Sequence, residues 1–198
     1  MNIKQAKLKR LAGTMRTVFD ILFWASVVSG IMGFLAFVAS YFIPDSFFVI
    51  TNSQKGKMGI TIDGMVNFKI NPEVYNNLSI KPLLQNLFPM ATVISILLMV
   101  LLHQVRLILK TVAMDVPFDK NNPKRLLNIG ITLLIGAFAV EYVEGRVAQA
   151  IVDLLKLEDI VINISPDGIM IFTGFLVIIL AGVFQYGNYL QEEYDATL

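Results

Sequence analysis

The sequence predicts an all-α membrane protein, a four-transmembrane-helix bundle with a small extracytoplasmic β-element. The first observation is composition: hydrophobic residues make up 56% of the 198 residues and charged residues only 16%, against about 45–50% and about 25% in average soluble domains. The second is a set of long apolar stretches, and the third is the uneven distribution of Lys and Arg between their connections. A free soluble enzyme is excluded, because a domain of this size cannot bury so much apolar surface.

The apolar stretches predict four membrane spans. A helix needs about 20 apolar residues to cross about 30 Å of hydrocarbon. Three stretches of 24 residues contain no Asp, Glu, Lys or Arg, whereas a fourth has only 15 such residues before Glu141 and can span if its helix continues to Val147. We expect a single membrane domain over residues 1–198 with spans at about 18–43, 83–105, 126–147 and 168–190.

The basic residues predict the orientation of these spans. Ten of the 16 Lys and Arg residues lie in the N-terminal arm and in the connection 106–125. Cytoplasmic loops carry an excess of Lys and Arg. We therefore expect a multi-pass protein of the cell (plasma or inner) membrane, with both termini and the loop 106–125 in the cytoplasm and with the lipid bilayer as a partner.

The connection between the first two spans has strand character. Apolar and polar residues alternate over 60–62 and 66–70, and the Asp63-Gly64 pair between them is typical of a two-residue hairpin turn. We expect an extracytoplasmic β-meander at about residues 46–71. The stretch 159–164 before the last span is a further strand candidate, which can pair with this meander and stabilise it.

The cytoplasmic loop combines turn signals with a bulky apolar residue. Pro117 is expected to stop the extension of the second helix. Asn121 or Asn122 can cap the next helix, with Pro123 in its first turn. Phe118 stands in an otherwise polar loop, so the loop is either a plain turn with a helix cap or a docking surface.

Two motifs in the second half of the chain resemble a family of bacterial four-span membrane proteins that is catalogued only as a domain of unknown function. The first is Val-Pro-Phe at 116–118, followed by Asn122 and by Arg-Leu-Leu-Asn-Ile-Gly at 125–130. The second is Gly-Asn-Tyr-Leu-Gln-Glu-Glu-Tyr-Asp at 187–195. The resemblance implies an integral membrane protein that is often encoded beside a small Cro/CI-type helix-turn-helix regulator, and it carries over no catalytic residues.

These motifs define the candidate surface for a cytoplasmic partner. The net charge of +1 gives no basic footprint for nucleic acid, so we expect no direct nucleic-acid contact. The resemblance implies a protein partner instead, the small helix-turn-helix regulator. The candidate docking residues are Pro117, Phe118, Asn122, Arg125, Gln191, Glu192, Glu193 and Asp195.

Three polar residues inside or beside the spans are candidate intramembrane sites: His103, Glu141 and Glu144. A charge at the bilayer centre costs roughly 2.5–3.5 kcal/mol. Glu141 lies about 22 Å along a helix that begins at Leu126, in the outer third, which favours solvation at the interface over an ion or proton pathway. His103 lies near the inner end of its span and can meet polar residues of the fourth span, which favours a packed, hydrogen-bonded role over pH or metal sensing.

The first span also contains small residues at helix-packing intervals. Ser26 with Gly30, and Ser29 with Gly33, form two small-xxx-small pairs. Such pairs let helix backbones approach closely in lipid. They indicate packing within the chain, with homo-oligomer formation as the alternative.

The sequence gives no positive sign of catalysis. It has no Cys and one His, which excludes disulfides, thiolate chemistry and multi-histidine metal sites, and it lacks the common nucleotide-binding and hydrolase motifs. We expect no enzyme activity, no cofactor and no metal. The preferred function is a regulatory or signalling partner of a small cytoplasmic DNA-binding protein. The alternatives are a small transporter or channel subunit, and a structural or immunity-type membrane protein.

Overall fold

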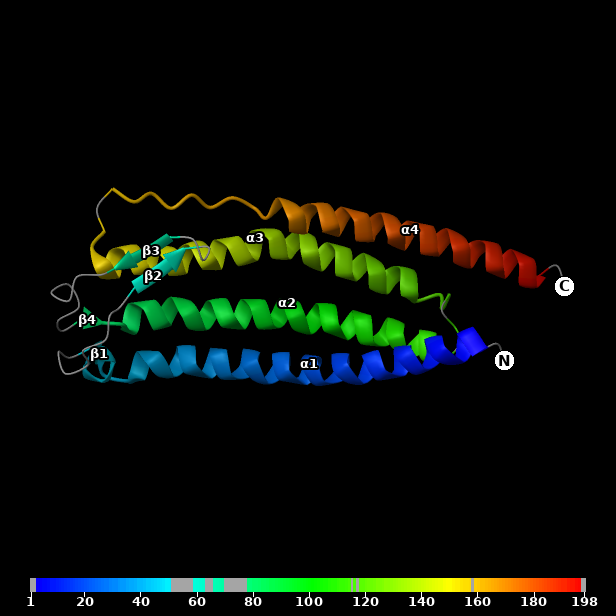
Figure 1. The fold of residues 1–198 in the computed structure, drawn as a ribbon, viewed down its shortest axis with the longest axis horizontal. Helices are drawn as coiled ribbons and strands as arrows, with labels where there is room; N and C mark the ends of the chain where they lie inside the picture. The colour runs from blue at the N-terminus through cyan, green and yellow to red at the C-terminus, as the bar shows by residue number, and fades with distance from the viewer. Residues whose placement is uncertain are drawn as a thin grey trace.

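Four long helices dominate the computed structural model, which describes residues 3–50, 59–62, 66–69, 78–114, 116, 118–157 and 159–196. Each helix contains a stretch that is long and apolar enough to cross a membrane, which supports a multi-pass membrane protein. Consecutive helices run in opposite directions (Figure 1). Both chain termini lie at one end of the molecule, here called the terminal end, and the strands lie at the other, here called the β end (Figure 1). The helices are α1 (Ile3–Phe42), α2 (Lys81–Ala113), α3 (Asn122–Leu155) and α4 (Gly168–Ala196).

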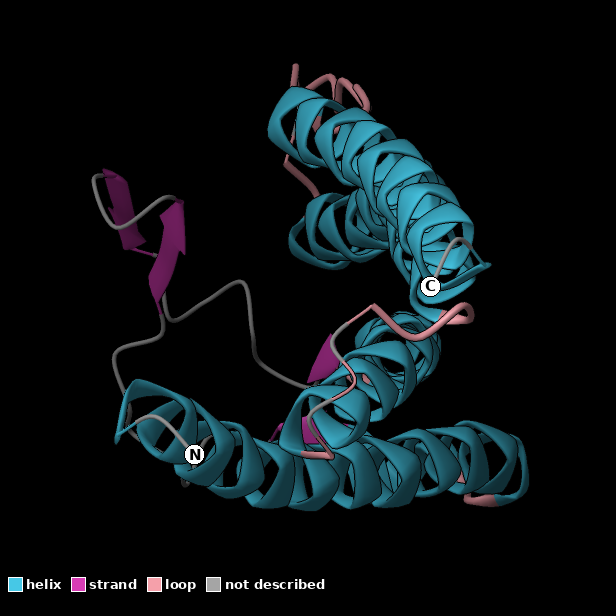
Figure 2. Cartoon of the chain, turned by 90° about the vertical axis from the view of Figure 1, so that its right-hand side faces the viewer, coloured by secondary structure: helices cyan, strands magenta, loops and turns pink. Residues whose placement is uncertain are grey.

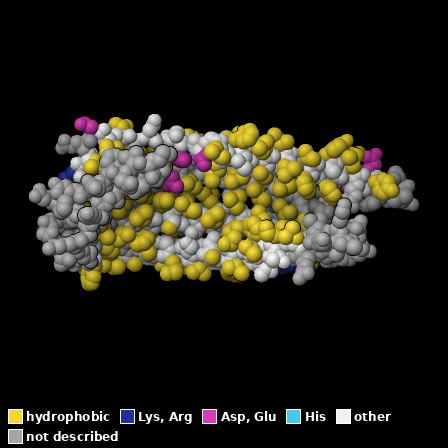
Figure 3. Space-filling view, in the orientation of Figure 1, with side chains coloured by type: hydrophobic (Ala, Val, Ile, Leu, Met, Phe, Trp, Pro, Cys, Tyr) yellow, Lys and Arg dark blue, Asp and Glu magenta, His cyan; other side chains and the backbone are white. Residues whose placement is uncertain are grey.

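The helices pack in sequence order as a curved row. The extensive contacts join α1 to α2, α2 to α3, and α3 to α4. The view along the helix axes shows that the row is open on one side (Figure 2). Large apolar side chains such as Trp24 and Phe172 are exposed on its surface, and hydrophobic side chains cover most of the described part of the face in Figure 3. Exposed apolar side chains are stable against lipid tails, so the row has the surface of a membrane protein.

Small residues set the close approach of α1 to α2. A Cβ atom added at Gly33 would lie 2.9 Å from the Oγ1 atom of Thr92, and one added at Gly30 would lie 3.2 Å from the Cβ atom of Ser95. The Ser95 hydroxyl donates a hydrogen bond of 3.1 Å to the Ser29 hydroxyl across this contact. Ser26 is buried and donates its hydroxyl hydrogen bond within α1. The predicted packing residues of the first span therefore face a helix of the same chain.

Two glycines set the approach of α3 to α4. A Cβ atom at Gly130 would lie 2.9 Å from the carbonyl oxygen of Gly174 and 3.2 Å from the backbone nitrogen of Ile178. A Cβ atom at Gly174 would lie 3.1 Å from the carbonyl oxygen of Gly130. Backbone atoms cannot move aside as the end of a long side chain can, so this crossing requires glycine on both helices.

The crossing also leaves α4 displaced toward the terminal end. The backbone N–H of Asp167 donates a hydrogen bond of 3.2 Å to the carbonyl of Ala137, in the middle of α3. Helix α4 therefore begins level with the middle of α3, and its last turns extend beyond the first turn of α3 (Figure 1). On the side where α4 packs against its first half, the other half of α3 runs beside the extended segment 159–167 (Figure 1).

The β-element is smaller than the predicted meander, and its strands pair in a different arrangement. The strands β2 (Gly59–Ile62) and β3 (Val66–Lys69) pair antiparallel on either side of the predicted turn, while residues 63–65 lie outside the described residues. The strands β1 (Val49–Ile50) and β4 (Leu78–Ser79) form a separate pair, and the short helix η1 (Asp45–Phe48) precedes them. Within the predicted range 46–71 the described residues thus contain the β2–β3 pair, whereas Val49–Ile50 pairs with a strand that lies outside that range.

The expected strand at 159–164 is wrong. The structure assigns no strand to its residues. The side chain of Ile164 occupies the space next to Gly145 of α3, so this residue packs against a helix, whereas Val161 is 91% exposed. That packing replaces the pairing with the meander that the alternation predicted.

We predict opposite effects of two glycine-to-alanine substitutions on stability. Gly130→Ala should destabilise the protein by about 1–3 kcal/mol, because the new methyl group meets the backbone of α4. Gly182→Ala is the control, since a Cβ atom there meets no other atom within 4 Å, and it should stabilise α4 by about 0.5–1 kcal/mol. Denaturant unfolding in detergent micelles, followed by circular dichroism, measures both. Equal stability of the two variants would contradict the crossing.

Candidate functional site

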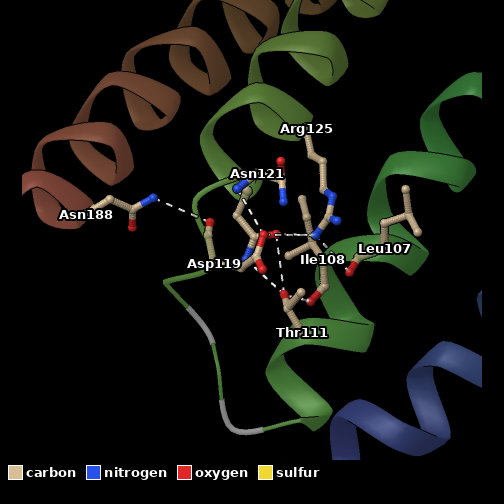
Figure 4. Close-up of polar contacts among 8 residues, drawn as sticks. Leu107, Ile108, Thr111, Asp119, Asn121, Arg125 and Asn188 are labelled. Carbon is tan, nitrogen blue, oxygen red and sulfur yellow. Dashed lines mark hydrogen bonds and ion pairs between the residues drawn. The ribbon is translucent and has the colours of Figure 1, made fainter. Parts of the chain in front are cut away.

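Polar side chains converge at the terminal end, where α2 is joined to α3. We call this group the corner cluster: Thr111, Asp119, Asn122 and Arg125. Figure 4 labels three of its members, Thr111, Asp119 and Arg125. Thr111 belongs to the last turn of α2, Asp119 to the connection, and the other two to the first turn of α3. Pro123 lies in that first turn, as predicted. The expected cap is wrong for Asn121, which stands at the N-cap position without a side-chain capping hydrogen bond.

Asn122 is the centre of the cluster and is fully buried, with 0% of its surface exposed. Its Nδ2 atom donates a hydrogen bond of 2.9 Å to the Thr111 hydroxyl. That hydroxyl donates in turn to the carbonyl of Ile108, at 2.7 Å. The Oδ1 atom of Asn122 accepts a hydrogen bond of 2.7 Å from the Nη1 atom of Arg125. The amide therefore connects the end of α2 to the start of α3.

Arg125 extends this network to the end of α2. Its Nη1 atom lies 3.3 Å from the carbonyl oxygen of Leu107 and 3.9 Å from the Oδ1 atom of Asp119. A guanidinium next to the carbonyl end of a helix interacts favourably with the helix dipole. Arg125 thus serves the internal structure of the corner, and its side chain is mostly buried.

Asp119 fixes the shape of the connection. Its carboxylate accepts a hydrogen bond of 2.9 Å from the backbone N–H of Asn121, and its carbonyl accepts one of 2.8 Å from the backbone N–H of Asn122. The N–H of Asn121 is the main cause that lowers the pKa of the Asp119 carboxyl, and the positive charges of Arg125 and Lys120 lower it further. The carboxylate therefore stays charged at neutral pH and holds the turn.

Phe118 lies on the outer side of this turn and against α4. Its ring centre is 5.7 Å from that of Phe184, and a Cβ atom at Gly187 would lie 3.7 Å from its ring. Half of the Phe118 surface, 50%, remains exposed. Pro117, the other loop candidate, lies outside the described residues. The structure thus brings the loop motif and the end of α4 together. Phe118 contacts α4 with one side of its ring and leaves the other side at the surface.

The predicted tail residues lie on the last turns of α4. Gln191, Glu192 and Glu193 are exposed, and Asp195 belongs to α4 although its side chain lies outside the described residues. Glu192 shares a cavity of about 610 Å³ between α3 and α4 with Lys120 and other residues. The acidic tail and the corner cluster are therefore parts of one end of the molecule.

His103 lies away from this site. Its ring centre is 5.9 Å from that of Phe23 on α1, so it faces α1 and does not meet the polar residues of α4 as expected. The guanidinium of Arg106 lies 4.0 Å from the centre of the same Phe23 ring. Asp20 lies 3.5 Å from Arg106 and 3.8 Å from Arg16. These contacts join the terminal ends of α1 and α2.

Glu141 and Glu144 lie beside the extended segment, beyond the point where α4 begins. Glu144 is exposed and Glu141 is half-buried. Neither forms an ion pair within 4 Å of a residue that the structure describes. Neither glutamate is part of the corner cluster.

The sequence pattern alone assigns no functional role to Thr111, Asp119 or Asp20, although each is central to a contact in the structure. A local signal existed for Asp119, because Asp two residues before Asn121 is typical of a turn in which the carboxylate accepts a backbone N–H. Asp20 directly precedes the first apolar stretch, and an antiparallel helix pair brings such a residue next to the basic end of the second span. No local pattern pointed to Thr111.

The helices and the cluster together define a multi-pass membrane protein with a built polar corner at its terminal end. The chain belongs to the family described as protein of unknown function DUF2975, whose model matches residues 70–198. The matched range includes α2, α3, α4 and the whole corner cluster. No curated protein and no solved structure matches the chain.

We predict that the corner depends on the amide of Asn122. Asn122→Ala should destabilise the protein by about 1–3 kcal/mol, because Arg125 and Thr111 lose a buried hydrogen-bond partner. Asn163→Ala, at an exposed asparagine, is the matched control and should change stability by less than about 0.5 kcal/mol. Thermal unfolding in detergent, compared between the two variants, is the measurement. A loss as small as that of the control would show that the cluster does not support the fold.

Proposed function

We propose that this membrane protein is the regulatory partner of a small cytoplasmic helix-turn-helix protein, which docks at its terminal end. The basic flanks of the spans support a cytoplasmic position for that end. The helices reach past the bilayer, since the 33 residues of α2 make a helix of about 50 Å, whereas hydrocarbon is about 30 Å thick. The eight residues of α2 beyond its apolar run 82–105 support a position of the corner outside the hydrocarbon, where a protein can reach it.

The observation that carries the proposal is the half-exposed Phe118 on a rigid turn. An aromatic side chain at a water-exposed turn is costly unless something covers it. Asp119 and Asn122 hold the backbone next to it through internal hydrogen bonds. A rigid aromatic anchor loses little entropy when it enters a pocket of a partner, and such residues dominate binding energies.

The acidic end of α4 supports the same partner class. Glu192 and Glu193 are exposed beside the corner. DNA-binding modules carry a basic face, so an acidic surface can attract that face and steer its approach. Contacts with the basic face would compete with DNA, which gives the membrane protein a means to hold the regulator and release it. The resemblance to a family often encoded beside such regulators agrees with this assignment.

The docking test is capture of the partner by the full chain in detergent, with the captured protein identified by mass spectrometry. The wild type should capture a small helix-turn-helix protein, and both Phe118→Ala and deletion of residues 191–198 should reduce capture at least about tenfold, because each removes part of the surface. Val116→Ala is the matched control, since Val116 is 50% exposed in the same connection, and it should leave capture unchanged.

The fold of each variant is checked by gel filtration, so that lost capture is not confused with lost structure. Unchanged capture by both the Phe118→Ala variant and the deletion would contradict the proposed surface. Capture of proteins without a DNA-binding module would contradict the proposed partner.

One observation favours a second function, an ion or proton pathway. A Cβ atom at Gly136 would lie 3.6 Å from the Leu97 side chain of α2, and Glu141 lies about 7 Å further along α3. This position is level with the middle of the apolar run 82–105 of α2, deeper than the outer third that the sequence predicted. A carboxylate and an extended backbone at this depth need access to water or protein partners.

For this second function we predict proton flux across liposomes that contain the protein, measured with a pH-sensitive dye inside the vesicles. Glu141→Gln should abolish the flux, because the amide cannot carry a proton as the carboxylate does. Glu193→Gln, the same change at an exposed residue of the tail, should leave it intact. Flux no greater than that of empty liposomes would exclude the pathway.

A further inference from the structure

A cavity at the terminal end lies between α3 and α4 and has a volume of about 610 Å³. We propose that it binds the headgroup of one anionic phospholipid whose headgroup carries a hydroxyl, the chemistry of phosphatidylglycerol. The cavity combines positive charge, an unpaired buried acceptor and an apolar floor. The inference does not depend on the helix-turn-helix partner, because none of these three features involves Phe118.

Positive charge gathers at the mouth of the cavity. Lys120 and Lys124 both line it, both are exposed, and neither forms an ion pair with a residue that the structure describes. Helix α3 begins at Asn122, so the positive end of its dipole lies between the two lysines. Glu192 is the acidic residue in the lining. The balance is positive, which matches a phosphodiester with one negative charge.

Asn188 supplies an acceptor that has no donor. The residue lines the cavity and is 9% exposed. Its Nδ2 atom donates a long hydrogen bond of 3.4 Å to the carbonyl of Asp119 (Figure 4), but its Oδ1 atom has no hydrogen-bond partner among the described residues. An unpaired buried acceptor is costly. Phosphate oxygens carry no proton at neutral pH, so the matching ligand group is a hydroxyl next to the phosphate.

The floor of the cavity selects a lipid over a soluble phosphate. Leu127 and Ile178 line it together with Gly182, and a Cβ atom at Gly182 would meet nothing within 4 Å. This apolar surface continues along two membrane helices, in the direction that an acyl chain takes from its headgroup. A soluble phosphate ester would leave the floor unmatched.

The experiment measures lipid binding to the purified full chain in detergent by native mass spectrometry. The probes are phosphatidylglycerol, phosphatidylethanol, which has the same charge but no headgroup hydroxyl, and zwitterionic phosphatidylcholine. The wild type should bind phosphatidylglycerol most tightly. Lys124→Gln should weaken that binding about fivefold, whereas Lys110→Gln removes an exposed lysine that does not line the cavity and should leave it unchanged. Asn188→Leu should remove the preference for phosphatidylglycerol over phosphatidylethanol.

Several outcomes would overturn the proposal. Equal losses for Lys124→Gln and Lys110→Gln would mean that lipids gather around the protein through unspecific attraction. Equal binding of phosphatidylglycerol and phosphatidylcholine by the wild type would exclude an anion site. Displacement of the lipid by an equal concentration of soluble glycerol phosphate would show that the ligand is not a lipid. If Asn188→Leu fails to fold, the comparison of Lys124→Gln with Lys110→Gln still decides the result.

Discussion

The arrangement of the terminal end depends on one buried amide. The Nδ2 atom of Asn122 donates a hydrogen bond to the Thr111 hydroxyl of α2, and its Oδ1 atom accepts one from Arg125 of α3. A buried asparagine is stable only while both ends of its amide are paired. It therefore fixes the angle at which the chain leaves α2 and enters α3, and everything attached to that turn takes its position from it. The exposed side of Phe118 and the two cavity lysines are held in this way.

A different constraint governs the rest of the molecule. Lipid tails provide no hydrophobic force that drives helices together, so close packing must do so. Helix contacts here use Gly30 and Gly33 on α1 and the Gly130–Gly174 pair between α3 and α4, while large side chains face outward. The glycine crossing determines how far α4 slides along α3. That displacement in turn produces both the cavity at the terminal end and the extended segment beside Glu141.

The sequence could predict what depends on local pattern. The four long helices, the place of Pro123 in the first turn of α3, and the pairing of β2 with β3 all follow from composition, turn-forming residues or the alternation of apolar and polar residues. The sequence could not predict that Asn122 points inward, because the local rule for an asparagine before Pro123 is a helix cap. Nor could it predict the displacement of α4. That displacement depends on the contact between Gly130 and Gly174, and the sequence does not show which glycines of different helices meet. The cavity depends on both of these features, which is why neither Asn188 nor Lys124 stood out as a ligand-binding residue.

The row of helices has a consequence for biosynthesis. Every extensive helix contact joins neighbours in the chain, so the sequence separation between partners is small and folding needs few long-range encounters. Each span can pack against its predecessor as soon as it leaves the translocation machinery, without waiting for a later span. Assembly in order of synthesis is thus built into the topology, because the α1–α2 pair can dock before α3 enters the membrane.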